Sequence, residues 1–516
     1  MPERISENIL SGFSGFVAAH MGLHFPYQSW DRLENGIRSA APDFGFTDIE
    51  SCIQWLQSNS LTKKQIEILA SHLTVGETYF FREQRSFEIL EEHILPELIH
   101  ARRGKDQRLR IWSAACCTGE EPYSIAILLD KILPDLKDWN ITILATDINP
   151  LFLKKASAGR YKEWSFRSSP SGIKKRYFTN RGKGNFEILP HIKKMVEFSY
   201  LNLSEDAYPS IFNNTYAMDI IFCRNVLMYF TQDYAKQVVR RLYSSLADGG
   251  SLIVSPVETS PVLYSQFETI KFPGAVFYRK ESEKGLKTST YDSRISCAET
   301  LTSVYPDYQE RQEVVSRTQR VLRQKAAALP LEGESKKQKT SESQKTLYEE
   351  ALALYEQCRY AKAAEKLIEL LFVNQPDDNG ELPPEKMLRL LTIAYANQGK
   401  LDDSLTWCRR TIEIDKLDPG NHYLHATILQ AMGQFAEAVK SLKRAIYIDP
   451  DYVLAHFALG NLTRQMGKFK ESEKYFKNAA SLLRGLDQGR VLPDSEGMTA
   501  GKLREMISKL KIQCLS

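Results

Sequence analysis

The feature that most constrains the fold is a regular spacing of small residues in the last third of the chain. Three glycines stand 34 residues apart in succession: Gly399, Gly433 and Gly467. Thr411, Ala445 and Ala479 repeat the same interval. Between them the apolar residues follow helical spacing, so each period predicts two helices joined by a turn. Such units stack on their neighbours, and the small residues allow adjacent helices to approach closely.

A helix–turn–helix period of 34 residues is the length of the tetratricopeptide repeat (TPR). The segment "QCRYAKAAEKLIELL" resembles a further unit. We therefore predict TPR repeats over 345–485 and a C-terminal tail with a capping helix over 486–516. The alternative, unrelated amphipathic helices, does not account for two equal spacings. Because such arrays commonly hold a peptide on their concave surface, we expect a protein partner, which the sequence does not identify.

The hydrophobic pattern changes twice in the rest of the chain. This is expected, because a chain of 516 residues is too long to fold around one hydrophobic core. Residues 1–75 show helical spacing and predict a small N-terminal helical domain. Residues 76–280 contain short apolar runs such as "ITILATD" and "MDIIFCRN" separated by helical stretches, which predicts an α/β domain with a parallel sheet. Residues 281–344 are rich in polar and charged side chains and predict a linker.

Charge and cysteine content limit the cellular setting. The formal net charge of +4 is too small to favour nucleic acid as a partner. The eight cysteines show no CxxC pair, which favours reduced thiols in the cytosol. Charges interrupt the N-terminus where a signal peptide needs its apolar core, and no apolar run is long enough to span a membrane. We therefore expect a cytoplasmic protein without membrane insertion.

The stretch "RIWSAACCTGEEPYSIAILL", residues 110–129, predicts a strand, a tight turn and a helix. A dinucleotide would favour G-x-G-x-x-G in this turn and an acid about twenty residues further on. Here the turn has the single glycine Gly119, and Asp147 at the end of the next strand lies farther along, so the pattern disfavours NAD.

S-adenosylmethionine makes different demands, because it has an amine and ribose hydroxyls but no phosphates. One acid at the end of the second strand can accept the ribose hydroxyls, and a second acid can bind the amine. The pattern alone leaves open a turn that serves only packing.

Five motifs carry a family resemblance: "TVGETYFFRE", "WSAACCTGEEPYSIA", "ATDIN", "VEFSYLNL" and "DIIFCRNVLMYF". In this order they resemble the CheR family, chemotaxis receptor glutamate methyltransferases that use S-adenosylmethionine. The resemblance covers about residues 1–280. It implies a Rossmann-like methyltransferase domain with a small β-subdomain at about 163–196, so the fold class is α/β with helical domains on either side.

The resemblance also implies the site. Glu121 and Asp147 would hold the methionine and nucleoside parts of the cofactor, while Asn202 and Leu203 would frame the adenine. The cofactor-binding residues would be Gly76, Thr78, Arg82, Glu121, Asp147, Asn202, Leu203, Arg224 and Asn225. Relatives often carry an asparagine at the Gly76 position, where a backbone amide would have to substitute.

The chemistry implied is transfer of a methyl group to glutamate, leaving S-adenosylhomocysteine. A glutamate carboxylate with a pKa of about 4.3 is already ionised at neutral pH and needs no general base. Arg82 and Tyr229 are the catalytic candidates, Arg82 because a guanidinium can clamp a carboxylate. Tyr229 has the alternative of a core aromatic. No metal is expected, and Cys116 and Cys117 are interpreted as small fillers rather than a metal or redox site.

The resemblance implies methyl-accepting chemotaxis-type receptors as substrates and recruitment of the enzyme to membrane receptor arrays. Lys63, Lys64, Arg32 and Arg38 are candidates for receptor docking, although surface charges are often only solvated. Two other functions stay open. One is a non-catalytic adaptor that senses the cofactor, which the retained acids and arginines disfavour; the other is a small-molecule methyltransferase, which the flanking helical domains disfavour.

Overall fold

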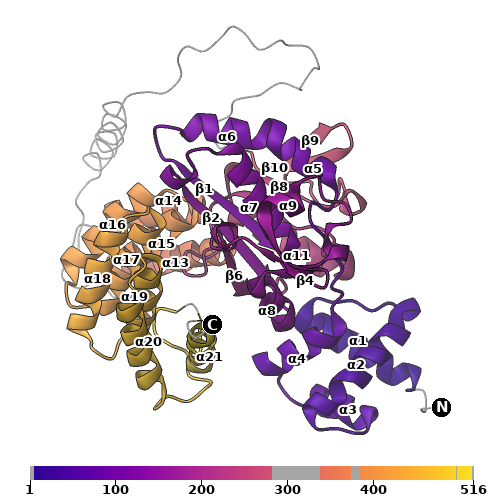
Figure 1. Cartoon of the computed structure of the whole chain (residues 1–516). Helices are drawn as coiled ribbons and strands as arrows, with labels where there is room; N and C mark the ends of the chain where they lie inside the picture. Colours follow the sequence, from indigo (N-terminus) through magenta and orange to yellow (C-terminus); the bar gives the residue numbers. More distant parts are fainter. Residues whose placement is uncertain (1–4, 282–336, 374–383, 496, 514–516) are drawn as a thin grey trace. The chain divides into compact units, whose positions relative to one another are not determined.

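A computed structural model describes residues 5–281, 337–373, 384–495 and 497–513 of the chain (Figure 1). The chain forms two compact units, Met1–Glu281 together with Tyr395–Ser516, and Ser282–Ala394.

The chain begins with four helices: α1 (Glu7–Met21), α2 (Trp30–Ala40), α3 (Ile49–Ser58) and α4 (Lys63–Leu73). Side chains cap three of them, because the first backbone N–H groups of a helix have no partner within it. Ser6 and Asp48 accept such N–H groups, and Thr62 forms a capping box with Gln65. The apolar faces of these helices share a core that includes Phe13, Leu33 and Ile37.

A seven-stranded sheet follows, with the order β6-β2-β1-β7-β8-β10-β9. Its strands are β1 (Arg108–Ala114), β2 (Asn140–Asp147), β6 (Val196–Tyr200), β7 (Met218–Phe222), β8 (Leu246–Ile253), β9 (Glu268–Phe272) and β10 (Ala275–Arg279). The first five in spatial order pair in parallel, while β10 is antiparallel to both of its neighbours. The mostly parallel sheet confirms the predicted Rossmann-like α/β class.

Alternate residues of the strands bury opposite faces of the sheet. Ile111, Ile143 and Ile220 belong to a core with α7 (Glu120–Ile132), α5 (Gln84–Ile89) and α6 (Leu95–Arg102). Trp112 and Leu144 belong to a second core with α11 (Gln232–Ser245). Because both faces are covered, the strands read as continuous apolar runs in the sequence.

The strand order creates a switch point between β1 and β7. From β1 the chain moves outward to β2, and it later returns to the other side of β1 as β7. In open α/β sheets ligands bind outside the carboxyl ends of the strands at such a point. The turns after β1, β2 and β7 therefore converge on one place.

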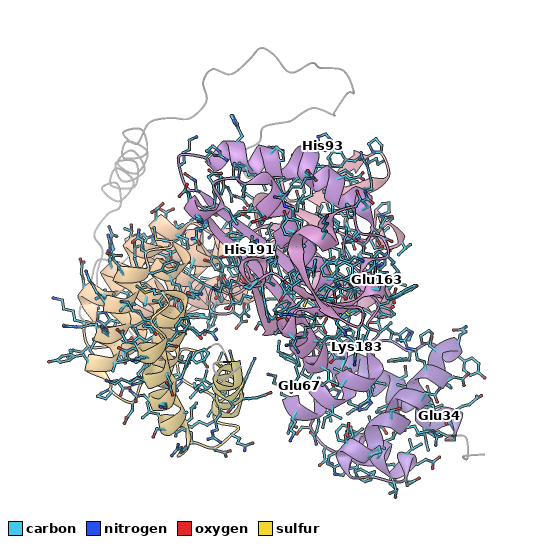
Figure 2. All side chains as sticks on the ribbon, viewed as in Figure 1. Glu34, Glu67, His93, Glu163, Lys183 and His191 are labelled. Atoms are coloured by element: carbon cyan, nitrogen blue, oxygen red, sulfur yellow. The ribbon has the colours of Figure 1, made fainter. Side chains whose placement is uncertain are left out.

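A separate three-stranded sheet has the order β3-β5-β4, formed by β3 (Arg160–Lys162), β5 (Asn185–Ile188) and β4 (Phe178–Gly182). Figure 2 labels Glu163 just after β3 and Lys183 between β4 and β5. This β-subdomain starts three residues before the range predicted for it, and Val196 belongs to β6 of the large sheet.

The C-terminal part is helical. One unit contains the pair α13 (Lys337–Glu356) and α14 (Tyr360–Val373), and α15 (Pro384–Asn397) follows. Two further pairs are α17 (Pro419–Ala431) with α18 (Phe435–Ile448), and α19 (Val453–Gln465) with α20 (Phe469–Leu483). The remaining helices are α16 (Leu401–Ile414) and α21 (Ala500–Gln513). The three periodic glycines follow α15, α17 and α19, each with φ between 74° and 76°.

The C-terminal end of the predicted linker differs from the structure. It was expected to extend to residue 344, but α13 begins at Lys337. Residues 282–336 lie outside the described part of the chain. Within the described part, no helix is both long and apolar enough to cross a membrane.

Candidate active site

A cavity that is partly open to solvent lies at the carboxyl ends of β1, β2 and β7. Including the open space at its mouth, its volume is about 960 Å³. The N-terminal helices contribute to it through Met21, Leu23 and Leu73. All of the predicted site residues except Gly76 line it: Thr78, Arg82, Glu121, Asp147, Asn202, Leu203, Arg224, Asn225 and Tyr229.

The turn after β1 brings the backbone to the cavity. Ala115 and Cys117 have φ values of 60° and 51°, a left-handed conformation that is uncommon for residues other than glycine. Gly119 has φ 94°, and a Cβ there would lie 2.8 Å from Ala156 Cβ. The tight turn allows α7 to start at Glu120, directly behind the cavity.

Only the second of the two adjacent glutamates lines the cavity. Glu120 is buried elsewhere, where its carboxylate accepts hydrogen bonds from Thr118 Oγ1 at 2.6 Å and Ser165 Oγ at 3.0 Å. It therefore ties the turn to the start of the β-subdomain. Glu121 is the one available to a ligand.

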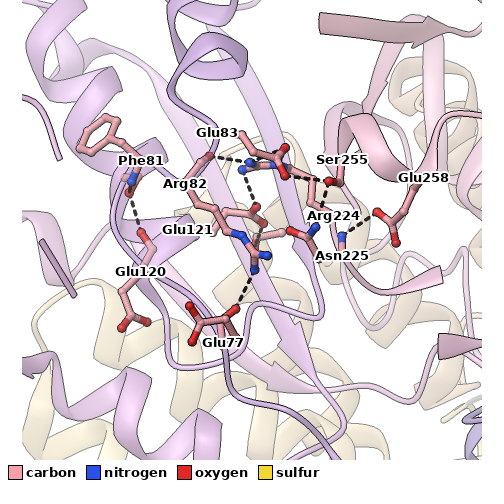
Figure 3. Close-up of polar contacts among 12 residues, drawn as sticks. Glu77, Phe81, Arg82, Glu83, Glu120, Glu121, Arg224, Asn225, Ser255 and Glu258 are labelled. Carbon is pink, nitrogen blue, oxygen red and sulfur yellow. Dashed lines mark hydrogen bonds and ion pairs between the residues drawn. The ribbon is translucent and has the colours of Figure 1, made fainter. Parts of the chain in front are cut away.

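Glu121 and Glu83, which lie in different segments of the chain, both form ion pairs with the buried Arg224. Arg224 Nη1 lies 3.1 Å from Glu121 Oε2, and Arg224 Nη2 lies 2.8 Å from Glu83 Oε2 (Figure 3). Ser113 Oγ donates to Glu121 Oε1 at 2.7 Å. Burial raises the pKa of Glu121, while Arg224 and the Ser113 hydrogen bond oppose that rise. The guanidinium thus stabilises the ionised form of Glu121.

Asp147 ends β2 with both carboxylate oxygens pointing at backbone donors. Cys117 N–H donates to Oδ2 and Asn149 N–H to Oδ1, each at 2.8 Å. Burial raises the pKa of Asp147 to about 6, although these hydrogen bonds favour the ionised form. A carboxylate oxygen has two lone pairs, so each oxygen can accept one more hydrogen bond from a ligand.

The turn after β7 depends on a second buried acid. Glu258 in η7 (Pro256–Glu258) accepts the N–H group of Asn225 at 2.6 Å (Figure 3). Its other carboxylate oxygen accepts the N–H group of Val226 at 2.7 Å. Met228 N–H adds a third hydrogen bond at 3.2 Å. Asn225 has φ 57°, so this carboxylate holds a left-handed residue in place at the edge of the cavity.

Ser255 connects this turn to the Arg224 network. Its hydroxyl donates to Glu83 Oε1 at 2.7 Å and accepts from Asn225 Nδ2 at 2.9 Å. Glu83, at φ 55°, immediately precedes α5. Segments far apart in sequence therefore position the Arg224–Asn225 pair jointly.

Arg82 lines the cavity with fewer partners than Arg224 has. Its Nη1 donates to the Glu77 carbonyl oxygen at 2.7 Å, and its carbonyl oxygen accepts a hydrogen bond from Arg224 Nη2. Phe81 N–H donates to Ser124 Oγ of α7 at 3.0 Å, which anchors the preceding residue. The backbone at Arg82 is fixed by these contacts, while part of its guanidinium is available to a ligand.

Asn202 and Leu203 line the cavity in different ways. The Asn202 amide donates to the His20 carbonyl oxygen of α1 at 2.9 Å, and its Oδ1 accepts from Ser204 Oγ at 2.8 Å. The side chain of Asn202 is therefore bound to the protein at both ends, and its carbonyl oxygen accepts the Glu205 N–H group at 3.1 Å. Leu203 contributes an apolar surface.

Of the four basic residues predicted to dock on the receptor, Arg32 alone lines the cavity. Arg32 lines the cavity, with its guanidinium 5.7 Å from the centre of the Tyr229 ring and 5.3 Å from that of Phe25. Lys63 and Arg38 do not line it and form ion pairs within their own helices, with Glu67 and Glu34 respectively. Lys64 also lies outside the cavity wall.

Cys116 and Cys117 both line the cavity and are free thiols. The pKa of each thiol is raised, mainly because burial removes water from the thiolate and secondarily because Asp147 lies nearby. This disfavours the thiolate, which is the form that binds metals and reacts. The interpretation of both as small fillers agrees with this environment.

Comparison with known proteins identifies the family. The model of the CheR methyltransferase SAM binding domain matches residues 76–276. Chemotaxis protein methyltransferase 1 of Pseudomonas aeruginosa is 36% identical over 219 residues, which are 41% of this chain and 77% of the relative. The chain belongs to the CheR family of chemotaxis protein methyltransferases.

Two further relatives agree with this assignment. Chemotaxis protein methyltransferase 2 of Vibrio cholerae is 35% identical over 217 residues, 42% of this chain and 74% of the relative. A probable chemotaxis protein methyltransferase of Rhizobium etli is 37% identical over 232 residues, 44% of this chain and 82% of the relative. Tetratricopeptide repeat models match 348–422, 426–467 and 453–482, which confirms the predicted repeats in this CheR protein.

The cavity fits the cofactor of the CheR family. Its wall combines the buried Asp147 and the partly buried Glu121 with apolar side chains such as Ile148, Leu201 and Leu203. Acids suit an amine and ribose hydroxyls and would repel a pyrophosphate, as the sequence pattern indicated. The family assignment and this set of donors and acceptors both support S-adenosylmethionine as the methyl donor.

Three polar residues of this site were absent from the predictions: Glu83, Ser255 and Glu258. Glu83 stands at the end of the quoted motif "TVGETYFFRE", directly beside Arg82. Ser255 and Glu258 follow the last parallel strand, and polar residues at that position belong to the ligand-binding edge of an α/β sheet. That rule would have identified both.

Proposed function

We propose that this CheR protein transfers the methyl group of S-adenosylmethionine to glutamate side chains of methyl-accepting chemotaxis-type receptors. The products would be glutamate methyl esters and S-adenosylhomocysteine. The observation that carries the proposal is the position of Arg82 in the cavity wall, where its carbonyl oxygen accepts a hydrogen bond from Arg224, the partner of Glu121.

The cofactor supplies an electrophilic methyl group on a sulfonium. Glu121 would bind the amine of its methionine part, and Asp147 would accept the ribose hydroxyls. The Asn202 backbone and the Leu203 side chain would border the adenine. Arg224 and Asn225 would close the site on the other side, held there by Glu83 and Glu258.

Arg82 would orient the acceptor carboxylate through two parallel hydrogen bonds, for which a guanidinium is suited. No proton has to be removed, because the glutamate attacks as a carboxylate. In agreement with this, none of the residues that line the cavity is a histidine. Orientation of the two reactants can contribute about 7–11 kcal/mol of rate acceleration.

Tyr229 is the second catalytic candidate and lines the same cavity. Its ring lies under the Arg32 guanidinium, and the two side chains would together border the path of the acceptor. The TPR repeats would bind a further protein partner and bring the enzyme to membrane receptor arrays from the cytoplasm.

The test is a methylation assay with the full-length protein, methyl-labelled cofactor and receptor-containing membranes. Treatment with mild base should release the label as volatile methanol, because carboxyl methyl esters hydrolyse under these conditions. Base-stable label, or no label on the receptor, would contradict the proposal. Labelling should also stop when the acceptor glutamates of the receptor are replaced by alanine.

A further inference from the structure

The cavity wall next to Asp147 contains an aromatic ring without an assigned role. Phe152 belongs to the first turn of α8 (Pro150–Ala158), the helix that follows β2. Its ring lines the cavity together with Ile148. The helix that carries it therefore starts directly beyond the acid expected to bind ribose.

The position of Phe152 is fixed by Asn149, which is fully buried. Asn149 Oδ1 accepts the N–H groups of Leu151 at 2.9 Å and Phe152 at 3.2 Å. Its Nδ2 donates to Thr74 Oγ1 at 2.9 Å. One side chain thus joins the start of α8 to the segment that follows α4.

That segment leads to Gly76, where the ring meets the backbone. A Cβ at residue 76 would lie 2.8 Å from Phe152 Cζ and 3.1 Å from Cε1. The first distance is shorter than a carbon–carbon contact permits, so any side chain at this position must displace the ring. Gly76 itself does not line the cavity, although its neighbours Val75 and Glu77 do.

We propose that Phe152 is a cofactor-binding residue whose ring packs against the adenosine part of S-adenosylmethionine, and that Gly76 is required because it leaves room for that ring. The inference rests on the cofactor of the proposed function. The adenosine part is specified because Asp147, Ile148 and Phe152 lie within six residues at the end of β2, whereas Glu121 lies in α7 and Arg224 follows β7. An aromatic face is a suitable partner for a purine.

The first experiment measures binding by calorimetry with the full-length protein and two ligands. S-adenosylhomocysteine has the whole product structure, and 5′-methylthioadenosine keeps the adenosine but lacks the amino acid part. Phe152→Leu and Phe152→Ala should lower the affinity for both ligands by a similar factor of roughly ten, as expected when a base loses an aromatic partner. Glu121→Gln should lower the affinity for S-adenosylhomocysteine and leave that for 5′-methylthioadenosine unchanged.

The matched control is Leu151→Ala on the same turn of α8. Leu151 is 59% exposed and does not line the cavity, so its truncation should leave both affinities unchanged. Phe152→Leu accompanies Phe152→Ala because it retains most of the apolar volume at this position. Thermal unfolding of each free variant separates a loss of folding from a loss of binding.

The second experiment tests the dependence of the ring on Gly76. Gly76→Ala should weaken both ligands about as much as Phe152→Ala does. In the Phe152→Ala background the same change should have little further effect, because the ring that it displaces is already gone. Additive effects of the two changes would overturn the role assigned to Gly76.

The remaining outcomes are also decisive. The inference about adenosine is wrong if both Phe152 variants bind the two ligands as tightly as the unchanged protein does. It is also wrong if they lose affinity for S-adenosylhomocysteine alone. In either case the proposed function stands. If the unchanged protein binds neither ligand, the cofactor assignment fails and this inference fails with it.

Discussion

Glu258 and Asn225 are joined by a hydrogen bond of 2.6 Å from the Asn225 N–H group to a buried carboxylate 33 residues away. The same carboxylate accepts two more backbone N–H groups from the turn after β7. Burial raises the pKa of Glu258, and these backbone donors oppose the rise. The acid therefore shapes the turn that carries Arg224 and Asn225 without lining the cavity itself.

Replacing Glu258 by alanine should destabilise the protein and lower its activity together. The three backbone donors lose their acceptor, and a buried donor without a partner costs about 1–3 kcal/mol. Glu258→Gln keeps one oxygen acceptor and should recover part of the loss in both denaturant unfolding and methyl transfer. Glu268→Gln on the exposed side of β9 is the control and should change neither. Full activity in Glu258→Ala would show that the turn is held by other contacts.

Arg224→Lys should separate charge from geometry at the buried pair of carboxylates. A lysine keeps the positive charge but cannot donate in parallel to both Glu83 and Glu121. We expect a loss of about 1.5–3 kcal/mol in the free energy of unfolding, the range for hydrogen bonds to charged groups. Weaker S-adenosylhomocysteine binding should accompany it.

A double-mutant cycle with Glu83→Gln checks this explanation. The combined change should differ from the sum of the single changes by about 0.5–3 kcal/mol, because the two side chains share one interaction. Additive effects in urea unfolding would mean that Glu83 and Arg224 act independently.

Much of this arrangement follows from the sequence, but the contacts between distant segments do not. The turn between β1 and α7 was predicted from its own residues, and so was the acid at the end of β2. That Glu121 rather than Glu120 lines the cavity depends on the direction in which α7 leaves the turn at Gly119, which local patterns leave undetermined. Glu83 and Arg224 are 141 residues apart, so neither residue's neighbours in sequence reveal the pair.

The predicted linker illustrates a different limit. Its polar composition indicated that it would not pack, yet α13 starts within it at Lys337. The segment "KQKTSESQKTLYEEALALYE" is rich in lysine, glutamate, glutamine, alanine and leucine, which have high helix propensity. A polar composition therefore does not tell where a helix begins.

Cofactor binding should weaken in acid because of Asp147. Its folded-state pKa is raised to about 6, and the ionised form is the one that can accept both ribose hydroxyls. The affinity should therefore be constant above about pH 7 and fall as the pH drops through 6, approaching about tenfold per pH unit if only the ionised form binds. Calorimetry with S-adenosylhomocysteine between pH 5 and 8 measures the profile. Asp147→Asn should bind weakly with no step near pH 6, whereas an unchanged step would assign the titration to another group.

Arg82→Ala should reduce methyl transfer much more than cofactor binding. Loss of a charged hydrogen-bonding partner costs about 2–5 kcal/mol, which corresponds to a decrease of roughly 30- to 5,000-fold in kcat/KM for the receptor. Arg85→Ala is the matched control, since Arg85 lies on α5 outside the cavity wall and pairs with Glu88 at the surface. Equal losses of kcat/KM in the two variants would remove Arg82 from its role at the acceptor carboxylate.

Gly460 tests the close approach of helices within a repeat. A Cβ at this position in α19 would lie 2.6 Å from two ring atoms of Phe476 in α20. Gly460→Ala should therefore destabilise this helix pair by about 1–3 kcal/mol, the usual cost of overpacking. Gly485→Ala is the control because no atom lies within 4 Å of its Cβ position. Phe476→Leu in the Gly460→Ala background should relieve part of the overlap. If Gly460→Ala leaves thermal unfolding unchanged, the two helices adjust freely and the small residue is not needed for their packing.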